Sequence, residues 1–151
     1  MNELSHIGND NNPSMVDVSD KPDMHRVAKA EGFIKLKTET VKLIADNTIK
    51  KGNVLVTAEL AGVMGAKKTP DLIPLCHSLN TTNIKVRAEL KENGVFISSE
   101  VSCIGKTGVE MEALTAVSIA LLTIYDMCKA VDKTMEIANI KLIEKTKANV
   151  K

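Results

Sequence analysis

The sequence predicts an α+β fold with an antiparallel sheet, and three observations support this prediction. A period-two alternation of apolar and charged residues, followed by an Asn-Gly pair, predicts a β-hairpin over 84–104. A long apolar helix is predicted directly after the hairpin, over 109–133. Further strands are predicted at 32–36 and 135–145, so that helices are interspersed among four strands.

The N-terminal part of the chain shows little periodicity. Residues 1–16 are rich in Asn, Asp and Ser and are predicted to form a flexible arm, with 17–151 forming a single domain. No clean period is found from 15 to 30, which predicts a loop. The first residues lack a basic start and an apolar stretch, so no signal peptide is expected.

Two helices and a short helical turn are predicted before the hairpin. Thr38 stands where an N-cap would be, and that helix is expected to end at Asp46-Asn47. Asn53 is the predicted N-cap of the second helix. Thr69 is the predicted cap of a short helical turn that has Pro70 at its first position and that Pro74 stops. The second helix has a run of small side chains that would let another backbone approach closely: Ala58, Ala61, Gly62, Gly65 and Ala66.

In the hairpin, the turn is expected at Asn93-Gly94 because both residues tolerate positive φ. The return strand is expected from Val95 to Ile104. One face of this strand is apolar and predicted to be buried, formed by Val95, Ile97, Val101 and Cys103.

The long helix is apolar almost all round, which predicts cover on several sides and therefore an oligomer interface. The resulting order β-α-α-β-β-α-β is that of a ferredoxin-like split βαβ sandwich with an extra helix in the first crossover. Fold class by itself does not give function.

Composition excludes several functional classes. The chain has 151 residues, with 20 Lys and Arg against 19 Asp and Glu, so no overall field favours nucleic acid or an anionic membrane. Aromatic residues make up only 2%, too few for base stacking. The longest apolar stretch, 113–128, is shorter than the ~20 residues that span a bilayer. Three cysteines without metal-ligand spacing predict reduced thiols in a cytoplasmic setting.

The long helix carries candidate chemical groups near its C-terminal end. Asp126 and Lys129 are three residues apart and therefore lie on one face. In apolar surroundings, desolvation would move both pKa values toward neutrality and suit acid–base catalysis. A structural ion pair explains the same spacing and is favoured on spacing alone.

The start of this helix carries a second group of candidates. Gly105-Lys106-Thr107 resembles part of a P-loop, but Glu100 stands where the pattern needs glycine; a tight connection or an anion-binding turn remains. Glu110 and Glu112 complement the helix dipole. At ~1.5 Å rise per residue, Glu112 and Asp126 are roughly 21 Å apart, so a site using both is either long or built from two subunits.

Two further features remain open on the residues alone. His77 lies in a predicted loop beside Cys76, where a structural hydrogen bond is the more common role. Lys50-Lys51 and Lys67-Lys68 bracket the small-residue helix, either as solvated ends or as phosphate contacts. Residue-level reasoning thus predicts an oligomeric domain with a possible anion site and no named reaction.

Three segments of the chain resemble the cyclic pyranopterin monophosphate synthase family, also called molybdenum cofactor biosynthesis protein C. They are MVDVSDK (15–21), KKGNVLVTAELAGVMGAKKTPDLIPLCHSL (50–79) and GKTGVEMEALTAVSIALLTIYDMCKAVDK (105–133). The resemblance extends from Met15 to about Lys145. The chain departs from the family pattern at Ser78, where proline is usual, and at Met24, where threonine is usual.

The resemblance implies a lyase that converts (8S)-3′,8-cyclo-7,8-dihydroguanosine 5′-triphosphate to cyclic pyranopterin monophosphate and diphosphate. It implies a homo-hexamer, a trimer of dimers with sites at subunit interfaces, and a functional link to the upstream radical GTP cyclase. No resident cofactor or metal is implied, although Mg²⁺ could accompany the triphosphate. The competing class is a non-catalytic nucleotide-binding ferredoxin-like module.

The resemblance also assigns residues. Asp126 is implied to be the catalytic acid/base, with Lys129 and Lys51 as its partners. The implied substrate-binding residues are Leu75, Cys76, His77, Met111 and Glu112, together with Lys21 and Arg26 of an N-terminal segment that closes over the triphosphate.

Overall fold

The computed structural model describes residues 10–151, so the first nine residues of the predicted arm lie outside the described part of the chain. Eight elements follow in order. They are β1 (Met24–Lys35), α1 (Thr38–Ala45), α2 (Val54–Lys67), α3 (Thr69–Leu72), β2 (Thr81–Lys91), β3 (Gly94–Gly105), α4 (Glu110–Cys128) and β4 (Glu136–Ala148).

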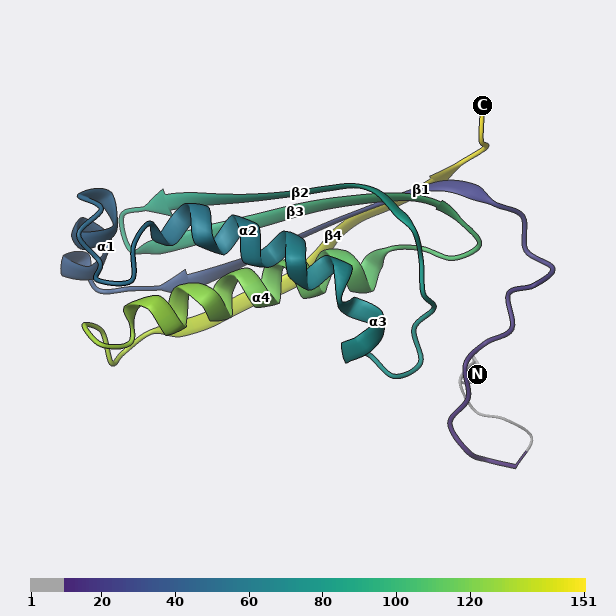
Figure 1. The fold of residues 1–151 in the computed structure, drawn as a ribbon, viewed down its shortest axis with the longest axis horizontal. Helices are drawn as coiled ribbons and strands as arrows, with labels where there is room; N and C mark the ends of the chain where they lie inside the picture. Colours follow the sequence, from purple (N-terminus) through teal and green to yellow (C-terminus); the bar gives the residue numbers. More distant parts are fainter. Residues whose placement is uncertain (1–9) are drawn as a thin grey trace.

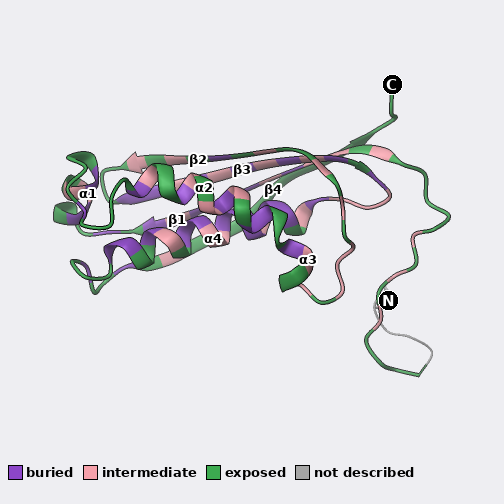
Figure 2. Cartoon of the chain, in the orientation of Figure 1, coloured by how far each residue is buried: buried purple, intermediate pink, exposed green. Residues whose placement is uncertain are grey.

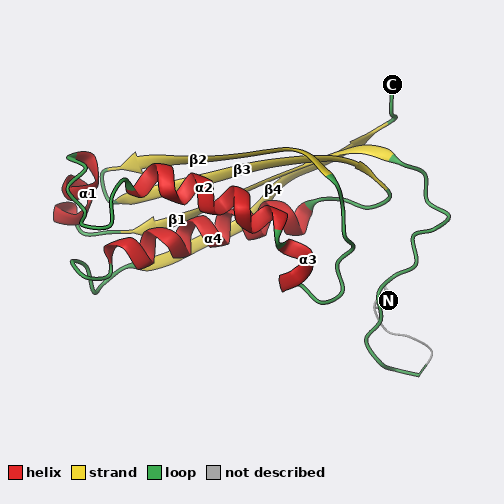
Figure 3. Ribbon diagram, viewed as in Figure 1, coloured by secondary structure: helices red, strands yellow, loops and turns green. Residues whose placement is uncertain are grey.

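The four strands form one antiparallel sheet in the order β2-β3-β1-β4. Helices α2 and α4 lie side by side across one face of this sheet, and α1 lies at one end of the two layers (Figure 1; Figure 3). The split βαβ topology and the ferredoxin-like α+β class predicted from the element order are therefore confirmed.

The core lies between the sheet and the two long helices, whose inward surfaces are buried while their outward surfaces are exposed (Figure 2). The predicted small face of α2 makes this packing close. A Cβ on Gly62 would lie 2.8 Å from Val86, and one on Gly65 would lie 2.7 Å from Ile119 of α4. Larger residues at these two positions would push α2 away from both the sheet and α4.

Strand β1 begins at Met24, so the predicted loop over 15–30 is wrong in its second half. The sequence pattern predicts only the end of this strand, from Gly32 on. It misses the earlier part because the buried residues there, Ala28 and Ala30, are small and give a weak alternation of hydrophobicity. The small residues leave room for α4: a Cβ on Gly32 would lie 2.8 Å from both Leu121 and Val117.

The hairpin and the buried face of its return strand are confirmed, but the turn is displaced by one residue. Lys91 pairs with Gly94, which places Glu92 and Asn93 in the turn. Neither Asn93 nor Gly94 has positive φ. Glycine is needed at 94 for another reason, because a Cβ there would collide with the carbonyl oxygen of Ile34 in β1.

Helix termini were predicted with mixed success. Asn53 caps α2 as predicted, its side chain accepting from Val56 N at 3.1 Å. Thr38 is the first residue of α1 and not its N-cap, which is Lys37. Similarly, Thr69 begins α3 after Lys68 instead of capping it.

Helix α4 ends at Cys128, five residues earlier than predicted. The chain turns there, and the backbone N–H groups of Val131 and Asp132 both donate to the Cys128 carbonyl at 3.0 Å. By length and composition α4 could cross a membrane, yet it packs against β1, β3, β4 and α2. It is the central core helix of the sandwich.

Candidate active site

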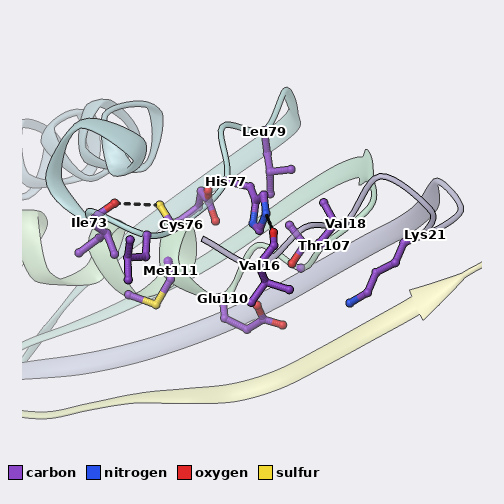
Figure 4. Close-up of a pocket in the computed structure, with 13 residues that line it drawn as sticks. Val16, Val18, Lys21, Ile73, Cys76, His77, Leu79, Thr107, Glu110 and Met111 are labelled. Atoms are coloured by element: carbon purple, nitrogen blue, oxygen red, sulfur yellow. Dashed lines mark hydrogen bonds between the residues drawn. The ribbon is translucent and has the colours of Figure 1, made fainter. Parts of the chain in front are cut away.

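A cavity of about 420 Å³ lies beside the N-terminal end of α4. It is formed where the α3–β2 loop, the start of α4 and the N-terminal segment meet (Figure 4). Six of the ten predicted site residues line it: Lys21, Leu75, Cys76, His77, Met111 and Glu112. A volume of this size is in the range of small-molecule sites.

The N-terminal segment covers the cavity and is fixed at several points. His77 Nε2 lies 2.6 Å from the carbonyl oxygen of Val16, and since a carbonyl only accepts, this nitrogen carries the proton (Figure 4). On the other side, Lys106 Nζ donates to the carbonyls of Ser19 at 3.1 Å and Lys21 at 2.8 Å. His77 therefore has the structural hydrogen bond expected of a loop histidine while it also faces the cavity.

Glu112 is the most buried charged group of the cavity, with 3% of its surface exposed. Burial raises the pKa of Glu112, and the negative charge of the neighbouring Glu110 adds to this shift. Burial thus makes protonation of Glu112 easier than that of an exposed glutamate.

The cysteine of the cavity is not an activated nucleophile. Burial, with a further contribution from the charge of Glu112, raises the pKa of Cys76. Its Sγ lies 3.4 Å from the carbonyl oxygen of Ile73, which orients the thiol toward the backbone (Figure 4). Because the thiolate is the reactive form, Cys76 serves as a packing and lining residue here.

The three predicted catalytic residues form a separate cluster at the C-terminal end of α4. Lys51 Nζ lies 2.8 Å from Asp126 Oδ2 and 3.1 Å from the Asp126 carbonyl oxygen. Lys129 Nζ lies 2.9 Å from Asp126 Oδ1. Each carboxylate oxygen of Asp126 thus accepts from one ammonium group.

The expectation that desolvation moves the pKa of Asp126 toward neutrality is wrong for this chain. Hydrogen bonds from Lys51 and then Lys129 hold the pKa of Asp126 below its ordinary value. The side chains of Lys51, Asp126 and Lys129 are 49%, 56% and 57% exposed, too open for burial to dominate. Asp126 is therefore a carboxylate in the isolated chain.

Arg26 lies neither in the lining of this cavity nor in the cluster around Asp126. Its guanidinium donates to the carbonyls of Gly105 at 3.3 Å and Lys106 at 3.0 Å, which fastens β1 to the turn before α4. It lines a neighbouring cavity that shares Gly108 and Glu110 with the first.

Seven residues that line the cavity were not among the site residues assigned from the sequence, although Thr107 and Glu110 had been weighed as an anion-binding turn and a helix-dipole contact: Val16, Val18, Ile73, Leu79, Thr107, Gly108 and Glu110. Thr107 and Gly108 belong to the turn whose sequence left an anion site open as one of two interpretations. The two valines belong to a segment without periodicity, and no sequence signal placed them against the α3–β2 loop.

An α+β sandwich with a cavity of this size, and with a carboxylate held between two ammonium groups, has the features of the small-molecule-binding class of domains. The chain belongs to the MoaC family, which it matches over residues 15–148.

Relatives in this family are similar along nearly the whole chain. Cyclic pyranopterin monophosphate synthase of Syntrophomonas wolfei is 52% identical over 145 residues, covering 95% of this chain and 92% of that protein. The synthase of Roseiflexus is 49% identical, covering 97% and 94%. Molybdenum cofactor biosynthesis protein 1 of Drosophila melanogaster is 48% identical over 95% of this chain, which spans only 26% of that longer protein.

Proposed function

We propose that this protein is a cyclic pyranopterin monophosphate synthase of molybdenum cofactor biosynthesis. Its substrate is (8S)-3′,8-cyclo-7,8-dihydroguanosine 5′-triphosphate, and its products are cyclic pyranopterin monophosphate and diphosphate. The observation that carries the proposal is the identity of about half of all residues to curated synthases of matching length.

The groups present suit this chemistry. Opening the five-membered ring of the purine and closing the pyran ring both move protons between nitrogen and oxygen atoms, which requires acid–base groups such as Asp126, Lys51 and Lys129. Forming the cyclic phosphate requires attack of a ribose hydroxyl on the α-phosphorus with loss of diphosphate. Lys21 and His77 in the cavity can offset the negative charge of the phosphates.

The two groups of residues act together only if two chains form one site. Glu112 and Asp126 are roughly 21 Å apart along α4, farther than one small reacting centre extends. A second copy that places its Asp126 cluster at the cavity of the first would complete the site. It would also exclude water from Asp126 and raise its pKa toward the range useful for proton transfer.

We extend this to a homo-hexamer, a trimer of dimers. An apolar row on the outward side of α2, comprising Val56, Leu60 and Met64, is exposed in the single chain and supports association. The proposed setting is the cytoplasm, with substrate supplied by an upstream radical GTP cyclase. No resident cofactor is proposed, and Mg²⁺ would enter, if needed, with the triphosphate.

The alternative of a non-catalytic nucleotide-binding module is not favoured. Such a module would need Asp126 and its lysines only for structure, yet all three side chains are about half exposed and so stabilise the fold little.

The direct experiment incubates the purified protein with the cyclised dihydro-GTP substrate and measures released diphosphate together with the oxidised pterin product. Formation of both products, lost in Lys51→Ala and in Asp126→Ala, is the expected result. Tight binding without product in the wild-type protein would favour the binding module instead.

A further inference from the structure

Asp132, which follows α4, is a buried carboxylate with four hydrogen bonds and lies in neither candidate group. Only 1% of its surface is exposed. One oxygen, Oδ2, accepts from Lys37 N at 2.9 Å and Thr40 Oγ1 at 3.0 Å. The other, Oδ1, accepts from Thr134 N at 2.9 Å and Thr134 Oγ1 at 3.0 Å. Each oxygen thus holds a different segment of the chain.

The first segment held by Asp132 is the start of α1. Lys37 is the N-cap of this helix and has no side-chain cap bond of its own, and its backbone N–H donates to the carboxylate of Asp132. Thr40 is itself 1% exposed, and its hydroxyl bonds to Asp132. Helix α1 lies at the end of the sandwich where α2 begins and α4 ends (Figure 1).

Helix α1 leads to Lys51. After the helix, Thr48 N donates to the Leu43 carbonyl at 2.9 Å, and Gly52 N donates to the Ile49 carbonyl at 2.9 Å. These bonds make the connection to Lys51 short and folded back on α1, and buried Ile49 anchors it to the core. Lys51 is thus joined to α1 by a short, hydrogen-bonded connection.

The second effect of Asp132 concerns Lys129. Asp132 N donates to the carbonyl of Cys128 at 3.0 Å, and Lys129 N donates to that of Tyr125 at 2.9 Å, so both lie in the turn that ends α4. The four hydrogen bonds of its carboxylate fix Asp132 in this turn, three residues after Lys129.

We propose that Asp132 is a positioning residue for the Lys51–Asp126–Lys129 cluster. It clamps the end of α4 to the start of α1 and thereby sets the two lysines on opposite oxygens of Asp126. The inference rests on the proposed function for its effect on turnover, but the geometry of the cluster can be measured without substrate.

The test uses ¹⁵N NMR of the lysine ammonium groups. An ammonium held by a carboxylate exchanges slowly and gives a resolved signal, and loss of a signal in Asp126→Asn assigns it to the cluster. Asp132→Asn keeps the volume but leaves only one accepting oxygen, so we expect both cluster signals to be lost and kcat to fall about 100-fold, the effect typical of a 1 Å misplacement. KM should change much less, because Asp132 is not among the residues that line the cavity.

Two isosteric variants form a matched pair that also serves if Asp132→Asn fails to fold. Thr40→Val removes one bond from the α1 side of Asp132, whereas Thr134→Val removes one from the other side. We expect Thr40→Val to weaken the Lys51 signal and lower kcat about tenfold, a smaller misplacement. Thr134→Val should leave the Lys51 signal unchanged. Ser99→Ala, which removes a buried bond to the Ala113 carbonyl in the middle of the sandwich, controls for general loss of stability.

The outcomes separate this inference from the proposed function. Unchanged ammonium signals in folded Asp132→Asn, or equal effects of Thr40→Val and Thr134→Val, would overturn the positioning role. Lost signals with unchanged turnover would support the clamp and show that the cluster is not catalytic. If the wild-type protein forms no product, the proposed function fails while the NMR comparison still decides the role of Asp132.

Discussion

The two ends of helix α4 carry carboxyl groups of the same chemistry in opposite environments. At the N-terminal end, Glu112 is buried beside the cavity, and burial raises its pKa. At the C-terminal end, Asp126 is half exposed between two ammonium groups, which lower its pKa. The comparison shows that the surroundings, and not the carboxyl group itself, set the direction in which each pKa is shifted.

The largest expected effect is on turnover at the exposed end. Asp126→Ala should lower kcat by about 10²–10⁴-fold, the contribution typical of a general acid or base. Its melting temperature should change little, because exposed ion pairs contribute little to stability. Diphosphate release and thermal unfolding are the two measurements.

The chain offers a close control for this variant. Glu89 pairs with Lys91 at 2.7 Å with side chains 54% and 49% exposed, almost the same as the Lys51–Asp126 pair, but on the hairpin. Glu89→Ala should leave turnover unchanged. Equal losses in the two variants would mean that surface charge in general, and not Asp126, supports the reaction.

The next largest effect is a recovery of activity when two inactive variants, one altered at each end of α4, are mixed. If one site takes its cavity from one chain and its Asp126 cluster from another, a mixture of Asp126→Ala and His77→Ala chains re-forms intact sites. Random pairing gives half heterodimers with one intact site each, so roughly a quarter of wild-type turnover should return. Co-refolding the two inactive variants and measuring product tests this, and no recovery would mean that each chain builds its own site.

A smaller effect concerns stability at the buried end. Because the pKa of Glu112 is raised in the folded chain, the folded state binds a proton more tightly than the unfolded state. Stability is therefore lost as pH rises from about 4.5 through the folded pKa. Glu112→Gln removes this loss and should raise the free energy of unfolding at pH 7 by on the order of 1 kcal/mol.

The measurement is urea unfolding of both proteins across a range of pH. Below the unfolded pKa the two should be nearly equal, and the advantage of the variant should grow with pH and then level off. A variant that is less stable than the wild type at pH 7 would show that ionised Glu112 is stabilised within the fold.

The sequence predicted structure most reliably where a feature depends only on the residues of a single element or hairpin. The alternation in β2 and β3 was sufficient for the hairpin, and the spacing of Asp126 and Lys129 was sufficient for their contact. It was least reliable where the identity of a residue or the end of an element depends on contacts with residues that are distant in sequence. Gly94 is required by the backbone of β1, and the end of α4 coincides with the bonds of Asp132 to the start of α1.

The same difference between local and distant contacts decided which features of the site could be predicted. The rise per residue along α4 is sufficient to separate Glu112 from Asp126, because both lie on one element. The approach of Lys51, 75 positions from Asp126 in sequence, came only from the resemblance to the family. Nothing in the pattern of residues indicated that Val16 would meet His77, because a single hydrogen bond to a carbonyl leaves no trace in composition or period.

The smallest effect distinguishes the two carboxyl groups by salt. The lysines lower the pKa of Asp126 at an exposed position, where raising ionic strength from 0.1 M to 1 M shortens the screening length from about 10 Å to 3 Å. The pKa of Asp126 should then rise toward its ordinary value of 3.8. Glu112 should respond little, because salt does not screen the cost of burial. Carboxyl ¹³C NMR titrations at the two salt concentrations measure both residues in one sample, and an equal shift at the two ends of α4 would contradict the assignment of charge to one and burial to the other.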